Sequence, residues 1–124
     1  MRELMIAGLG GFIGSACRYW VSMASYRVFG QDFPYGTLIV NVLGSFLIGF
    51  LMTLFDERFV INPNVRIFLT IGILGGFTTF STFSYETISL LREASYLMGV
   101  ANIIGTILTC LVATWAGSVI GKLF

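Results

Sequence analysis

The stretch GGFTTFSTFS, residues 75–84, lies inside the third of four long apolar segments of the chain. It opens with two adjacent glycines, which weaken a helix interior. Phe77, Phe80 and Phe83 follow at three-residue spacing, with hydroxyl side chains between them and no charge. In lipid, the backbone groups freed by a broken helix must be satisfied by protein, an ion or water. The stretch therefore raises two possibilities: a helix break near Gly75–Thr79, or an intact helix whose hydroxyls bond to carbonyls one turn earlier.

The composition indicates an integral membrane protein. Of 124 residues, 56% are hydrophobic and only 10% are charged, and the mean hydropathy is +0.91. Soluble domains carry about a quarter charged residues. Apolar runs at about 4–26, 36–55, 67–91 and 96–121 each meet the length of about 20 residues that a spanning helix needs. We therefore expect an all-α membrane protein of four helices, forming a single transmembrane domain over residues 1–124.

Several function classes are disfavoured by what the sequence lacks. It has no histidine, the commonest general base and metal ligand, and no recognisable nucleophile and base pair, so an enzyme is not expected. The net charge of +1 gives no basic surface for nucleic acid. Cys17 and Cys110 fall inside apolar runs and read as small fillers. The first run could be a cleaved signal peptide, but MRE is a poor basic start and the run is long.

The positive charges give almost no bias toward one orientation in the membrane. With both termini on one side, that side carries four Lys and Arg residues (Arg2, Arg58, Arg66, Lys122) and the other three (Arg18, Arg27, Arg92). Because orientation follows this difference, the chain is expected to insert both ways up, unless one charge fixes it. Four helices leave no wide lumen, so a transport path would be narrow or lie between subunits. GxxxG spacings, such as that of Gly10 and Gly14, favour close helix association.

Polar residues within the apolar spans are candidates for function. Asn41 needs partners wherever it is buried, so it either joins helices or donates to a permeating ion. In the fourth span, Asn102 and Thr106 lie four apart and share a helix face. Arg18 could attract anions at a vestibule or reach to the interface, and Glu86 could respond to passing ions or cap the third helix.

The aromatic and hydroxyl pattern after the glycines suits a small anion. Phe80 and Phe83 are interleaved with Ser81, Thr82 and Ser84. Such a phenylalanine stripe usually faces a core or lipid. However, aromatic rings carry a positive edge, and ring edges with hydroxyl or amide donors could replace hydration without binding the ion too tightly.

Two blocks of sequence carry a family resemblance. GTLIVNVLGSFLIG at 36–49, followed by GGFTTFSTFSYE at 75–86, resembles the Fluc-type fluoride channel family, as does the arginine of ACRYW. The resemblance covers the whole chain. It implies an antiparallel, dual-topology homodimer in a bacterial inner membrane, with two narrow pathways for passive fluoride efflux and hence fluoride resistance. It also implies a structural, untransported sodium ion at the dimer interface, held by the backbone carbonyls of Gly75 and Thr78.

The resemblance also assigns residues to the fluoride pathway. The family's pore asparagine matches Asn41, its pore phenylalanines match Phe80 and Phe83, and further matches are Ser81, Thr82, Glu86 and Arg18. The fourth span departs from the family pattern, which often has an aromatic or imidazole side chain there. The nearest equivalents in this chain are Asn102 and Thr106.

Two other functions compete with a channel. A small dual-topology, proton-coupled exporter of organic cations needs a membrane-embedded carboxylate. The first two spans contain no Asp or Glu after Glu3, which leaves Glu86 as the only candidate. A non-transporting assembly subunit is the other alternative, and in it substitutions at Asn41 or Phe80 would affect dimer stability alone.

Overall fold

The computed structural model describes residues 1–124 and is built from helices alone. Four segments are long and apolar enough to cross a membrane, as predicted. The elements in chain order are α1 (Arg2–Phe29), α2 (Tyr35–Thr53), the π-helix η1 (Leu54–Arg58), α3 (Pro63–Arg66), the π-helix η2 (Ile67–Leu74), α4 (Gly75–Phe77), α5 (Phe80–Arg92) and α6 (Tyr96–Gly121).

The first three spans are longer than their apolar runs, and the fourth, Tyr96–Gly121, coincides with its run. The third starts at Pro63 rather than at 67, because its first turn has its own start signal. The Asn62 side chain accepts a hydrogen bond from the Asn64 N–H at 2.8 Å, and proline occupies the first helical position. Polar residues at span ends thus continue the helices toward the membrane surface.

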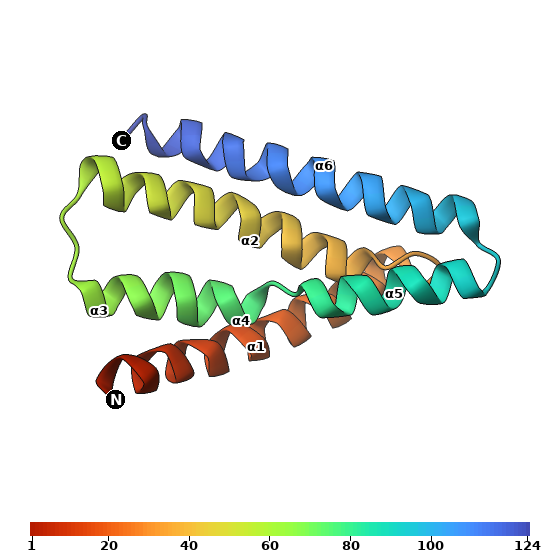
Figure 1. Cartoon of the computed structure of the whole chain (residues 1–124), viewed down its shortest axis with the longest axis horizontal. Helices are drawn as coiled ribbons and strands as arrows, with labels where there is room; N and C mark the ends of the chain where they lie inside the picture. Colours follow the sequence, from red (N-terminus) through yellow and green to blue (C-terminus); the bar gives the residue numbers. More distant parts are fainter.

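The helices run along one another, and both chain termini lie at the same end of the molecule (Figure 1). α2 packs along α6, and α1 crosses the first half of the third span. Glycines permit these close approaches. A Cβ on Gly49 of α2 would lie 2.1 Å from the Thr114 carbonyl oxygen of α6, and one on Gly14 of α1 would lie 2.0 Å from the Ile73 carbonyl oxygen.

The third span is broken, which confirms the predicted break and rules out the intact helix. The helix stops at Phe77 and restarts at Phe80. Thr78 (φ −87°, ψ 158°) and Thr79 (φ −152°, ψ 121°) between them are extended. The break therefore falls just after the two glycines, which stay helical in α4. Gly76 instead lets α4 press against α1, since a Cβ there would lie 2.6 Å from the Gly11 carbonyl oxygen.

Candidate functional site

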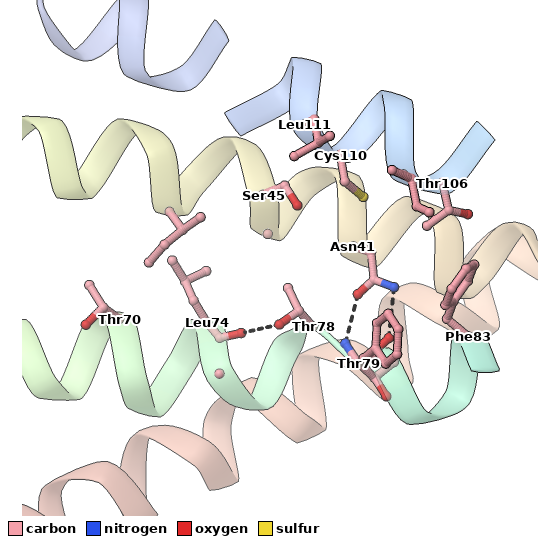
Figure 2. Close-up of a pocket in the computed structure, with 15 residues that line it drawn as sticks. Asn41, Ser45, Thr70, Leu74, Thr78, Thr79, Phe83, Thr106, Cys110 and Leu111 are labelled. Carbon is pink, nitrogen blue, oxygen red and sulfur yellow. Dashed lines mark hydrogen bonds between the residues drawn. The ribbon is translucent and has the colours of Figure 1, made fainter. Parts of the chain in front are cut away.

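Asn41 holds Thr79, the second extended residue of the break, in place. Its Oδ1 accepts a hydrogen bond from the Thr79 N–H at 2.8 Å, and its Nδ2 donates to the Thr79 carbonyl at 2.9 Å (Figure 2). Asn41 and Thr79 are both buried, each only 9% exposed. One amide from α2 thereby satisfies both backbone groups of a non-helical residue, as an apolar environment requires.

This pairing frees a carbonyl at the end of α4. In a continuous helix the Thr79 N–H would donate to the Gly75 carbonyl, four residues earlier. It donates to Asn41 instead, so the Gly75 carbonyl lacks its helical partner. The Thr78 side chain turns back and donates to the Leu74 carbonyl at 3.0 Å, while the Thr78 backbone is extended. On the α4 side of the break, the Gly75 carbonyl oxygen is therefore the one left without its helical donor.

The other side of the break is the N-terminus of α5. Thr79 caps this helix: its Oγ1 accepts from the Thr82 N–H at 3.3 Å and donates to Thr82 Oγ1 at 3.1 Å. Ser81 Oγ lies 3.4 Å from the same Thr79 hydroxyl. The first N–H groups of a helix lack intrahelical partners and carry partial positive charge, which favours an anion.

A cavity of about 450 Å³ opens beside the break, between α2, the third span and α6. None of its lining residues is charged. Figure 2 shows several of its polar side chains together with Phe83. The Phe80 and Phe83 rings have centroids 5.4 Å apart and are tilted by 53°. Half of the twelve site residues predicted from sequence line it: Asn41, Gly75, Thr78, Phe80, Phe83 and Thr106.

Glu86 lies in a separate hollow. That hollow has a volume of about 430 Å³ and is formed by the α1–α2 loop and the later turns of α5. The Tyr26 hydroxyl donates to Glu86 Oε2 at 3.0 Å, and the Thr37 hydroxyl donates to Oε1. Both carboxyl oxygens of Glu86 therefore have partners from the first two helices.

The fourth span contributes two predicted residues in different ways. Thr106 lines the cavity, whereas Asn102 does not. Asn102, only 2% exposed, donates from Nδ2 to Thr87 Oγ1 at 2.9 Å and accepts from the Thr106 hydroxyl at 3.2 Å. The predicted polar stripe of α6 thus continues into α5.

The remaining predicted residues lie elsewhere. Arg18 on α1 and Ser84 on α5 are half-buried and line neither hollow, and Ser81 and Thr82 belong to the α5 cap. Three functional candidates were not singled out from sequence: Tyr26, Thr37 and Thr87. Thr37 had a usable signal, since it lies four residues before Asn41 and so shares its helix face. No local pattern marks Tyr26.

Fold and site together define a class: a small membrane protein of four spans with an uncharged cavity at a helix break. The family model described as CrcB-like protein, Camphor Resistance (CrcB), matches residues 5–118. The chain belongs to this family, which confirms the resemblance read from its motifs.

Curated relatives agree over nearly the whole chain. A protein of Citrifermentans bemidjiense named fluoride-specific ion channel FluC is 44% identical over 122 residues, 98% of each chain. Relatives with the same name are 51% identical over 107 residues in Clostridium perfringens (84% of each chain) and 45% identical over 119 residues in Clostridium novyi (96% of this chain, 93% of the relative). These relatives are named as ion channels, in agreement with the expectation that the chain is not an enzyme.

Proposed function

We propose that this protein is a fluoride-selective channel that lets fluoride leave the cell passively and so confers fluoride resistance. The observation that carries the proposal is the uncharged cavity at the break, which combines phenylalanine rings with the N-terminus of α5. Ring edges and unpaired N–H groups attract an anion weakly, and weak binding allows it to leave again. The names of the relatives supply the identity of the ion.

Within this pathway the predicted residues take different roles. Phe80 and Phe83 supply the aromatic lining, and Ser81 and Thr82 stand at the α5 cap beside it. Asn41 acts by holding the break, because both ends of its amide are bonded to Thr79. Glu86, Arg18 and Ser84 lie off the cavity, so any part they play is at a mouth of the pathway.

The pathway is completed by a second copy of the chain in antiparallel orientation. The cavity is an open groove, and the Phe80 side chain that borders it is 77% exposed. A second chain packed on this face would close the groove into a narrow path. The near balance of positive charges on the two sides allows both orientations.

A structural sodium ion fits the α4 side of the break. No group of three or more His, Cys, Asp and Glu side chains gathers anywhere in the structure, so a cation would need other oxygen ligands. The Gly75 carbonyl has lost its helical partner, and Thr78 is extended. Unwound carbonyls of this kind coordinate sodium in other membrane proteins. Gly75 and Thr78 of two chains would supply four such oxygens at the dimer axis.

The test is ion release from liposomes. The purified protein is reconstituted with potassium fluoride inside, valinomycin is added, and external fluoride is followed with an electrode; chloride and a lipophilic cation are measured in parallel. Rapid fluoride release with little chloride release supports the channel. Uptake of the lipophilic cation without fluoride release would favour the proton-coupled exporter, with Glu86 as its carboxylate. If a well-folded dimer in sodium shows neither fluoride release nor uptake of the cation, the protein is a non-transporting assembly subunit.

A further inference from the structure

A buried chain of hydrogen bonds links α6 to α5 and begins and ends at the cavity wall. The Thr106 hydroxyl donates to Asn102 Oδ1 (3.2 Å), Asn102 Nδ2 donates to Thr87 Oγ1 (2.9 Å), and the Thr87 hydroxyl donates to the Phe83 carbonyl (2.7 Å). Thr87, Asn102 and Thr106 are 5%, 2% and 7% exposed. Only Thr106 and Phe83, the two ends, line the cavity.

The Phe83 carbonyl, at the end of this series of hydrogen bonds, sets the direction of every bond in it. A carbonyl can only accept, so the Thr87 hydroxyl must donate its single proton to Phe83. The Thr87 oxygen can then only accept, so the NH₂ end of the Asn102 amide must face it. The carbonyl end of that amide therefore faces Thr106, whose hydroxyl must donate its proton. The Thr106 oxygen presents only lone pairs to any other neighbour.

We propose that Asn102 and Thr87 are positioning residues that turn the Thr106 hydroxyl proton away from the cavity, so that Thr106 accepts hydrogen bonds from pathway water and does not donate to the anion. The proposal rests on the proposed function. It assigns the two walls of the cavity opposite characters. The α5 wall offers positive ring edges and N–H groups, and the α6 wall offers an acceptor. An acceptor opposite the donors prevents the anion from being held too tightly.

Three variants and one control test this arrangement in the liposome assay, with maximal fluoride release and the half-saturating fluoride concentration measured separately. T106V removes the hydroxyl and keeps the side-chain shape. T87V removes the acceptor of Asn102, which frees its amide to reverse and donate to Thr106; the Thr106 proton then points into the cavity. The third variant combines both changes. The control is T109V, because the Thr109 hydroxyl bonds only to the Gly105 and Thr106 carbonyls of its own helix, and Thr109 lines neither of the two hollows.

The proposal expects T109V to match the wild type in both quantities. T106V should lower the half-saturating concentration by about twofold, because the acceptor that weakens binding of the anion is lost. T87V is expected to lower the half-saturating concentration and the maximal release about tenfold, since a donor to a charged ion strengthens binding. Adding T106V should return both quantities to those of T106V alone, because no hydroxyl then remains to turn. A merely structural role for Thr87 would not be relieved in this way.

Three results would overturn the proposal. The first is a higher half-saturating concentration in a folded T106V dimer, which would make the Thr106 hydroxyl a direct donor to fluoride. The second is an effect of T87V that persists in the double variant, and the third is a folded T87V without effect. If T87V does not fold, the half-saturating concentration of T106V alone tests the proposal. Absence of fluoride release from the wild type would instead contradict the proposed function.

Discussion

Replacing Asn41 by alanine should destabilise the protein strongly, although the change removes only an amide. Both hydrogen bonds of this amide go to the backbone of Thr79, at 2.8 and 2.9 Å, and both residues are buried. A buried donor or acceptor that loses its partner costs about 1–3 kcal/mol. Two such groups give an expected loss of about 2–6 kcal/mol in the free energy of unfolding.

The assay is denaturant unfolding in detergent, followed by the fluorescence of the two tryptophans. Asn41→Asp is an informative companion, because an ionised carboxylate would place an acceptor oxygen against the Thr79 carbonyl and bury an unpaired charge, so at neutral pH it should lose at least as much as Asn41→Ala. Ser45→Ala is the matched control, since Ser45 lies one turn further along α2 and lines the same cavity. The reasoning is refuted if Asn41→Ala unfolds within about 0.5 kcal/mol of the wild type, a change typical of neutral surface substitutions.

Two further predictions concern packing and the second hollow. Gly49→Ala should separate α2 from α6, because its methyl group would lie 2.1 Å from a carbonyl oxygen. A methyl group on Gly105 would meet no atom of a neighbouring element within 4 Å, so Gly105→Ala should be neutral or stabilising by up to about 1 kcal/mol. Thermal unfolding of the two variants checks this, and equal melting temperatures would contradict it. Tyr26→Phe removes one hydrogen-bond donor to Glu86 and should lower the free energy of unfolding in denaturant by about 1 kcal/mol. The control is Tyr85→Phe, because the Tyr85 side chain borders the same hollow but is exposed, and this change should cost nothing measurable. Equal losses of stability in the two variants would contradict the prediction.

The four spans and the break were predictable from local sequence, because both follow from composition over short windows. Twenty apolar residues without charge have few alternatives to a spanning helix. The exact place of the break was harder to predict. Gly75 and Gly76 remain helical and serve the contact with α1, while the extended residues are Thr78 and Thr79, which Asn41 holds. That partner lies 38 residues away in sequence, beyond any local pattern.

The site could be predicted only in part, for the same reason. Motif spacing identified residues that line the cavity, such as Phe83 and Thr106. It could not separate Thr106 from Asn102, four residues earlier on the same face, because only the packing of α6 against α5 decides which of them meets Thr87. Likewise, Glu86 follows the hydroxyl band in sequence, but Tyr26 and Thr37 hold it in a different hollow.

The central claim is that fluoride passes through the cavity beside the break. The most direct measurement compares fluoride release by Phe80→Ala and Phe12→Ala dimers in liposomes. Both phenylalanines are 77% exposed in the single chain, so neither change should unfold it, but only Phe80 lines the cavity. The account predicts at least a tenfold fall in release for Phe80→Ala and wild-type release for Phe12→Ala. Equal release by the two variants would show that the ion takes another path.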